Sequence, residues 1–165
     1  MDLGATRSSF IIYDHGVIQF SLSLAFAGQE VTEKISNAMN LELAEAEKMK
    51  KECGLDPKKC KGNLKSALEG SLNELADKIT QAIQFYKMHF PEKNPLTGIR
   101  LCGGGANLPA LENYLSAKLK LKVRKANPWV NLFPAGQLPM DEEHSLLYAT
   151  AIGLAIRAME TPINL

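Results

Sequence analysis

One long apolar stripe in the middle of the chain constrains the fold more than any other feature. Its members recur at steps of three or four over 27 residues, which is the spacing of one face of an α-helix. The stripe consists of Leu64, Leu68, Leu72, Leu75, Ile79, Ile83, Tyr86 and Phe90, and Pro91 follows it. At 1.5 Å per residue, the pattern predicts a helix about 40 Å long that ends at the proline.

The segments on either side of this helix alternate between strand and helix patterns. Upstream, two β-type runs flank the turn formers Asp14-His15-Gly16, which predicts a hairpin, and a helical pattern follows from Gly28 to about Cys53. Downstream, the predicted elements are a strand at 99–102, a helix at 108–119, a strand at 121–124 and a helix at about 142–159. The chain is therefore expected to adopt an α/β fold with a helical insertion.

Composition excludes several classes of function. The chain has 165 residues, of which 45% are hydrophobic and 22% charged, as in an ordinary globular domain. A net charge of +1 gives no reason to expect nucleic acid or an anionic membrane as a partner. No run approaches the roughly 20 apolar residues of a membrane span, and we expect no signal peptide at the N-terminus.

The cysteines and histidines suggest no metal site or catalytic group. Cys53, Cys60 and Cys102 are expected to be free thiols in a reducing compartment, for which the cytoplasm is the simplest choice. No set of zinc ligands surrounds them. The histidines, which are His15, His89 and His144, lie in a predicted turn and at predicted helix ends. We therefore predict no catalytic residues.

The first stretch with a chemical meaning is Asp2-Leu3-Gly4-Ala5-Thr6-Arg7-Ser8. It resembles the second phosphate motif of the actin-like ATPase superfamily, in which a strand–turn–strand presents backbone N–H groups to nucleotide phosphates. The resemblance implies that Asp2, Gly4, Ala5 and Thr6 bind the nucleotide, and that Asp2 holds Mg²⁺ through water. The family commonly has two or three glycines in this turn, so an ordinary turn leading into the hairpin is the alternative.

The second stretch runs from Leu101 to Pro109 and resembles the adenosine motif of the same superfamily. Its residues Gly103, Gly104 and Gly105 follow a predicted strand and precede a predicted helix, and glycines let a flat base and its ribose approach the backbone. Asn107 is expected to cap the helix and to belong to the nucleotide site. A glycine-rich turn needed only for packing is the alternative.

The third stretch runs from Ala46 to Gly54 and resembles the superfamily's helix that faces the nucleoside. Glu47 and Lys50 are three residues apart, so a helix places them on one side, where the resemblance implies contacts to ribose and adenine. The alternative is a solvated face with helix ion pairs, which contribute only a few tenths of a kcal/mol.

Within the superfamily, the chain is most similar to the PilM type of type IV pilus assembly proteins, which is related to FtsA and MreB. The linker 55–63 before the long helix is short, and stretches 83–87 and 148–157 resemble PilM-type helices. The implied fold is a ribonuclease-H-like actin-type lobe with a small helical subdomain inserted. Residues 1–27 and 91–165, with the C-terminal part of the long helix, are then expected to form subdomain IIA. Residues 28–63 would form the helical subdomain IIB, and residues 64–90 the long helix that links the two.

The resemblance also implies a function. Complete proteins of this superfamily clamp ATP between two lobes, and this chain is expected to be the second lobe, from a truncation or a gene fragment. It would be the ATP- and Mg²⁺-binding half of a cytoplasmic scaffold, peripheral at the inner membrane through PilN-type partners that the other lobe largely holds. We expect no ATP hydrolysis by this chain alone, and at most a weak ATPase in a complete protein.

Two other functions stay open at this stage. An FtsA-like cell-division membrane anchor would end in a basic amphipathic helix, which residues 160–165 do not resemble. A lobe of a sugar or carboxylate kinase would need a substrate-binding acid in the other lobe.

Overall fold

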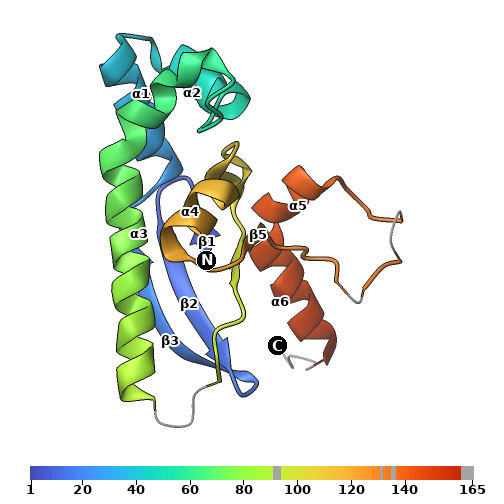
Figure 1. The fold of residues 1–165 in the computed structure, drawn as a ribbon. Helices are drawn as coiled ribbons and strands as arrows, with labels where there is room; N and C mark the ends of the chain where they lie inside the picture. Colours follow the sequence, from blue (N-terminus) through green and yellow to red (C-terminus); the bar gives the residue numbers. More distant parts are fainter. Residues whose placement is uncertain (91–93, 131, 135–136, 161–165) are drawn as a thin grey trace.

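The computed structural model describes residues 1–90, 94–130, 132–134 and 137–160 (Figure 1). Its strands are β1 (Asp2–Leu3), β2 (Ser8–Asp14), β3 (Val17–Leu24), β4 (Ile99–Leu101) and β5 (Val123–Lys125). Its helices are α1 (Gly28–Met39), α2 (Leu43–Glu52), α3 (Asn63–His89), α4 (Leu111–Leu119), α5 (Glu142–Leu147) and α6 (Ala149–Glu160). Two 3₁₀ turns, η1 (Cys60–Gly62) and η2 (Gly104–Asn107), precede α3 and α4. No helix of the described residues is long and apolar enough to cross a membrane.

The strands form one continuous layer through a backbone junction near the N-terminus. β1, β2 and β3 are successively antiparallel, while β4 and β5 are parallel. The Leu3 N–H donates to the Cys102 carbonyl oxygen at 2.8 Å, and the Cys102 N–H donates to the Met1 carbonyl oxygen at 2.9 Å. A parallel bridge between Asp2 and Cys102 therefore gives the order β3–β2–β1–β4–β5. The predicted hairpin is confirmed, with His15 and Gly16 at positive φ in its turn.

Helix α3 confirms the central prediction from the sequence. It spans 27 residues and ends at His89, two residues before Pro91, where the sequence predicted its end. The apolar stripe is buried along its whole length, except that Phe90 is only half-buried beyond the end of the helix. The helix runs beside the sheet from the hairpin turn to the helical pair α1–α2 at the opposite end (Figure 1). Its residues form the middle of a single hydrophobic core.

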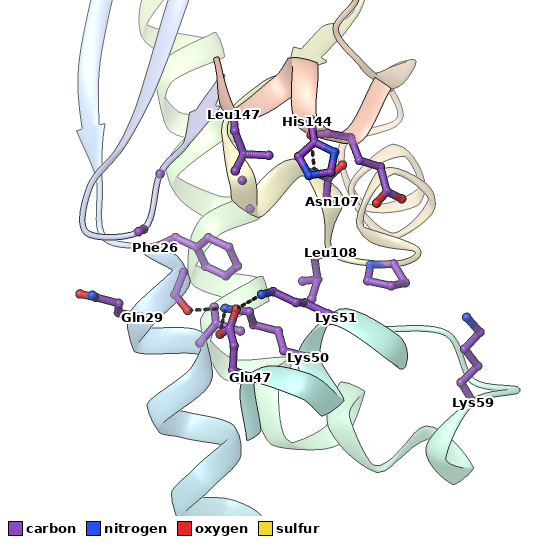
Figure 2. A pocket seen from close by; sticks show the side chains of 18 residues that line it. Phe26, Gln29, Glu47, Lys50, Lys51, Lys59, Asn107, Leu108, His144 and Leu147 are labelled. Carbon is purple, nitrogen blue, oxygen red and sulfur yellow. Dashed lines mark hydrogen bonds and ion pairs between the residues drawn. The ribbon is translucent and has the colours of Figure 1, made fainter. Parts of the chain in front are cut away.

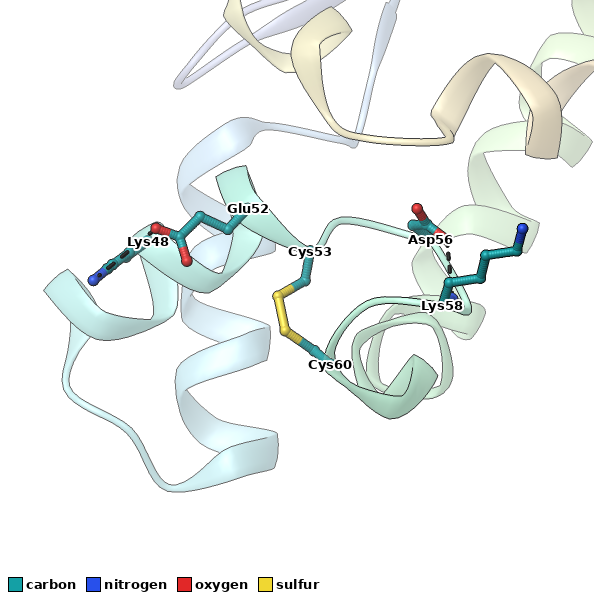
Figure 3. Close-up of a disulfide and its surroundings, with 6 residues drawn as sticks. All are labelled: Lys48, Glu52, Cys53, Asp56, Lys58 and Cys60. Atoms are coloured by element: carbon teal, nitrogen blue, oxygen red, sulfur yellow. Dashed lines mark hydrogen bonds and ion pairs between the residues drawn. A yellow bond between two sulfur atoms is a disulfide. The ribbon is translucent and has the colours of Figure 1, made fainter.

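The segment between α2 and α3 corrects the prediction that the cysteines are free thiols. Cys53 and Cys60 form a disulfide, with their Cα atoms 5.9 Å apart, whereas Cys102 is free (Figure 3). The six intervening residues turn back on themselves because Gly54 adopts a positive φ and the Lys59 N–H donates to the Asp56 carbonyl oxygen. This turn brings together two thiols that the sequence alone places in separate elements.

The predicted last helix is interrupted at Tyr148, which corrects the expectation of one helix at 142–159. In a continuous helix the Leu146 carbonyl oxygen would accept a hydrogen bond from residue 150. It accepts instead from the Gly103 N–H at 2.9 Å. The glycine loop therefore takes the hydrogen bond that the helix would use, and the chain divides into α5 and α6. The C-terminal residues 161–165 lie outside the described residues.

Candidate functional site

A pocket of about 830 Å³ lies between the helical pair α1–α2 and the segment formed by η2 and α5. Figure 2 shows Glu47, Lys50 and Lys51 on one side of it, with Asn107, His144 and Leu147 on the other. Seven of the ten residues predicted from the sequence line the pocket. These residues are Gly4, Ala5, Glu47, Lys50, Gly104, Gly105 and Asn107. The folding of the chain thus brings together residues from all three predicted stretches.

The glycine loop forms one wall of the pocket, and its three glycines have different roles. Gly103 has φ +80°, and a Cβ added there would stand 2.6 Å from the Leu3 carbonyl oxygen. A Cβ on Gly105 would stand 2.8 Å from the Leu3 Cβ. A Cβ on Gly104 would meet only the Leu147 side chain, at 3.8 Å. Gly103 and Gly105 are therefore needed for packing on β1, while Gly104 keeps the pocket surface bare.

Asn107 does not cap the following helix, which corrects the sequence prediction. α4 begins later, after Ala110 at φ +62°, and no side chain caps it. The Asn107 side-chain N–H₂ instead donates to the Glu143 carbonyl oxygen at 2.9 Å, which ties the loop to α5. The Asn107 Oδ1 is buried and has no hydrogen-bond partner among the described residues.

The opposite wall is a network of side chains between α1 and α2. Lys50 Nζ lies 2.5 Å from Glu47 Oε2, 2.8 Å from Thr32 Oγ1 and 3.0 Å from the Gly28 carbonyl oxygen. Thr32 Oγ1 lies 2.5 Å from the same Glu47 oxygen. The predicted i, i+3 pair of Glu47 and Lys50 therefore exists, and it is anchored to α1. It is not a solvated ion pair, because the Lys50 side chain is only 15% exposed.

The charge of Glu47 is stabilised by this network. Partial burial raises the pKa of Glu47, but hydrogen bonds from Lys50 and Thr32, together with the Lys50 charge, outweigh that effect. The pKa of Glu47 is lowered to about 2 as a result. Glu47 also pairs with Lys51 at 3.3 Å. The pocket therefore holds an ionised acceptor at neutral pH.

The turn after β1 contacts the same wall through its carbonyl groups. The Gly28 N–H donates to the Gly4 carbonyl oxygen at 3.0 Å, and the Gln29 N–H donates to the Ala5 carbonyl oxygen at 2.9 Å. In the described part of the chain, the backbone N–H groups of Ala5 and Thr6 have no acceptor. This turn therefore offers two backbone donors beside the pocket, which is the kind of group that binds anions.

Three predicted site residues do not line the pocket. Thr6 is exposed on the turn, and Gly103 faces β1 with the Asp2 carboxylate packed against it. The described residues contain no cluster of three or more His, Cys, Asp or Glu side chains that could hold a metal. Mg²⁺ bound with nucleotide phosphates needs only one or two carboxylates, so Asp2 suits such an ion but not a metal site made by protein alone.

Several pocket residues were not predicted from the sequence. Lys51, Leu108 and Pro109 lie inside stretches that the sequence singled out, so their neighbours were the available signal. Tertiary folding alone brings in the rest, and no local pattern marks them. These residues are Phe26, Gly28, Gln29, Val31, Lys59, Glu143, His144 and Leu147. The exposed His144 side chain lies 2.7 Å from Asp141 Oδ2.

The arrangement suits the binding of a flat anionic ligand. The apolar side chains of Phe26, Leu108 and Leu147 and the bare backbone at Gly104 provide a surface for a flat group. Glu47 provides an acceptor, and the lysines at the edge favour an anionic ligand.

Comparisons with known proteins identify the family and the fold of the chain. A sequence model of the family described as type IV pilus assembly protein PilM matches residues 1–159. Cell division protein FtsA from Buchnera aphidicola subsp. Acyrthosiphon pisum (strain APS) is 27% identical over 190 aligned residues, which cover 100% of this chain and 44% of that protein.

Two solved structures share the fold. One is the PilM–PilN type IV pilus biogenesis complex, with a TM-score of 0.72 and 24% identity over 97% of this chain and 45% of that chain. The other is ethanolamine utilization protein EutJ from Carboxydothermus hydrogenoformans, with a TM-score of 0.64 and 16% identity over 94% of this chain and 46% of that chain. The predicted actin-type fold is thereby confirmed. This chain spans less than half the length of each of these proteins, and it belongs to the PilM family of type IV pilus assembly proteins.

Proposed function

We propose that this chain is the nucleotide-binding half of a PilM-type scaffold in type IV pilus assembly. The observation that carries the proposal is the pairing of two surfaces across one pocket. Gly104 leaves bare backbone on one wall, and the ionised Glu47 with its lysine partners stands on the other. Such a slot accepts an adenine ring on the glycine side and ribose hydroxyls on the helix side.

ATP with Mg²⁺ is the proposed ligand. Its phosphates would lie toward the turn after β1, where the N–H groups of Ala5 and Thr6 are available. Asp2 would hold the Mg²⁺ through water. Asn107, Gly103 and Gly105 would keep the loop in place, and Gly4 would form the turn. The pocket volume of about 830 Å³ lies within the range of small-molecule sites.

The proposed division of the chain follows the pocket. We assign residues 1–27 and 91–165 to an actin-like subdomain IIA, residues 28–63 to a helical subdomain IIB, and residues 64–90 to the connecting helix. Under this division the nucleoside lies between the two subdomains. The turn that contains Cys53 and Cys60 also connects the two subdomains, because the Leu55 N–H donates to the Pro109 carbonyl oxygen at 2.8 Å.

The proposed cellular role follows from family membership and not from the pocket. The structure of a PilM–PilN complex supports a PilN-type partner, which would be held largely by residues outside this chain. The protein would act in the cytoplasm and reach the inner membrane through that partner, without inserting into the bilayer. This role concerns the complete protein.

A titration with ADP and ATP followed by amide chemical shifts tests the nucleotide proposal. Because one lobe supplies only part of the charge-assisted contacts, we expect a dissociation constant on the order of 0.1–1 mM. The shifts should cluster at residues 45–51 and 102–107. Guanosine diphosphate and ribose 5-phosphate serve as controls for the base and for the sugar phosphate. Shifts that cluster elsewhere, or no shifts at millimolar ADP, would reject the proposal.

A further inference from the structure

The network on the helix wall contains a buried hydroxyl that the proposed nucleotide site does not use. Thr32 is 7% exposed and lies on α1, whereas Glu47 and Lys50 lie on α2. Figure 2 shows the Glu47 and Lys50 side chains meeting at the base of the pocket, beside the start of α1. The inference below concerns what Thr32 does there, and it rests on the proposed nucleotide function.

The three protons of the Lys50 ammonium group already have three acceptors inside the protein. These acceptors are Glu47 Oε2, Thr32 Oγ1 and the Gly28 carbonyl oxygen, at 2.5, 2.8 and 3.0 Å. An ammonium group has three donors and no acceptor. Lys50 therefore cannot donate to a ligand without giving up one of these bonds.

Thr32 completes the network by donating its single proton. Its hydroxyl lies 2.5 Å from Glu47 Oε2 and 3.0 Å from the Gly28 carbonyl oxygen, and one proton serves one strong bond. The charged carboxylate is the nearer and stronger acceptor. Since Lys50 donates to Gly28 already, the Thr32 proton goes to Glu47.

The two oxygens of the Glu47 carboxylate therefore differ. Oε2 accepts from both Thr32 and Lys50, at 2.5 Å each. Oε1 has only Lys51, at 3.3 Å, and that lysine side chain is 73% exposed. One edge of the carboxylate is fixed by buried donors, and the other edge is left with an exposed partner in the pocket lining.

We infer that Thr32 is a positioning residue that, with Lys50, fixes Glu47 Oε2 and leaves Oε1 to accept hydrogen bonds from the ribose hydroxyls of a bound nucleotide. Lys50 then acts on the ligand through Glu47. The same network reaches the turn after β1. The Gly28 carbonyl oxygen accepts from Lys50, and the Gly28 N–H donates to the Gly4 carbonyl oxygen. Orientation of a charged acceptor before the ligand arrives reduces the entropic cost of binding.

Binding of ADP and of 2′,3′-dideoxy-ADP to three proteins tests this role. Thr32→Val keeps the volume of the side chain and removes the hydroxyl, while Thr32→Ser keeps the hydroxyl. We expect Thr32→Val to weaken ADP binding about five-fold and to leave dideoxy-ADP within about two-fold of the wild-type protein. Thr32→Ser should bind both ligands as the wild-type protein does.

The outcomes separate this inference from the proposed function. If the wild-type chain binds ADP and Thr32→Val weakens both ligands equally, or neither, the positioning role is wrong and the nucleotide site stands. If the wild-type chain binds no nucleotide, both proposals fall.

A carboxyl-carbon NMR titration of Glu47 provides a readout that needs no ligand. The pKa of Glu47, about 2 in the intact network, should rise in Thr32→Val and stay low in Thr32→Ser. An unchanged titration in Thr32→Val would show that the hydroxyl does not hold the carboxylate, and would overturn the inference.

Discussion

The two walls of the pocket are built by opposite means. On the glycine-loop wall the shape depends on side chains that are missing and on backbone hydrogen bonds, such as that from Gly103 to Leu146. On the helix wall it depends on charged and hydroxyl side chains, namely Thr32, Glu47 and Lys50. At Gly103 and Gly105 the first wall should tolerate almost no added atoms. The second should tolerate changes of volume but respond to changes of charge.

The difference has a physical basis. A glycine at positive φ that lies against another strand has no room to relax, because backbone atoms on both sides are fixed by the sheet. Long side chains on two packed helices can shift by small torsions, and water at the pocket mouth screens their charges. Rigidity and electrostatic tuning are therefore divided between the two walls, and the following experiments test that division.

Replacement of Gly103 by alanine should have the largest effect. An alanine at φ +80° is strained in the left-handed conformation, and its Cβ would stand 2.6 Å from the Leu3 carbonyl oxygen. We expect the free energy of unfolding to fall by about 3 kcal/mol, measured as a lower urea midpoint. Gly70→Ala, at an exposed position inside α3 with open space around it, is the control and should raise the midpoint. A Gly103→Ala protein as stable as the wild type would mean that this wall is not rigid.

Loss of the disulfide in the turn between α2 and α3 should have the next largest effect. The bond between Cys53 and Cys60 closes a short loop with a sequence separation of 7, so a Cys53→Ser, Cys60→Ser double variant should lose about 2 kcal/mol of stability. A thiol assay on the unfolded, unreduced chain should find only Cys102. Reduction before the assay should raise the count to three. Three reactive thiols without reductant would restore the expectation from the sequence.

On both walls the sequence predicted the local patterns and missed the contacts made by tertiary packing. Local patterns predicted the strand, the glycine loop and the i, i+3 pair of Glu47 and Lys50, because each depends on neighbours in the chain. The sequence did not predict Thr32, whose partners lie 15 and 18 residues away on another helix. It also predicted a helix cap at Asn107, which binds Glu143 instead. These contacts depend on tertiary packing, which no local period records.

The break at Tyr148 has a related cause. The periodic pattern through 142–159 is helical on both sides of it, and the interruption comes from a hydrogen bond that Gly103 donates across the molecule to Leu146. The disulfide was missed for the same reason, because the turn at Gly54 that brings Cys53 to Cys60 is set by contact with Pro109. The sequence therefore predicted the secondary-structure elements well and the tertiary contacts between them poorly.

Gly104→Val separates the two functions of the glycine loop. Its φ is not in the left-handed region and an added Cβ meets only Leu147 at 3.8 Å, so stability should stay within about 1 kcal/mol of the wild type. The branched side chain would occupy the surface where we propose that the base lies. Nucleotide binding should weaken at least about ten-fold, or about 1.4 kcal/mol, in the amide-shift titration. Gly104→Ala should weaken it less, and equal binding by all three proteins would place the base elsewhere.

The smallest expected effect is the acid dependence of the helix wall. Because the pKa of Glu47 is lowered to about 2, its ionised form stabilises the folded state at pH values above its ordinary value of 4.5. That contribution should decline as the pH falls from 4.5 through 2. Glu47 is 37% exposed, so solvent screening limits the contribution to about 1 kcal/mol or less.

Asp14 and Asp141 also have lowered pKa values, so the pH dependence of wild-type stability alone does not isolate the contribution of Glu47. The measurement is the difference in unfolding free energy between the wild type and Glu47→Gln from pH 6 to pH 2. This difference should shrink on acidification, whereas the corresponding difference for Gly105→Ala, whose added Cβ would meet only Leu3, should stay constant. A Glu47 difference that does not change with pH would mean that both walls depend on packing, and the contrast between them would be lost.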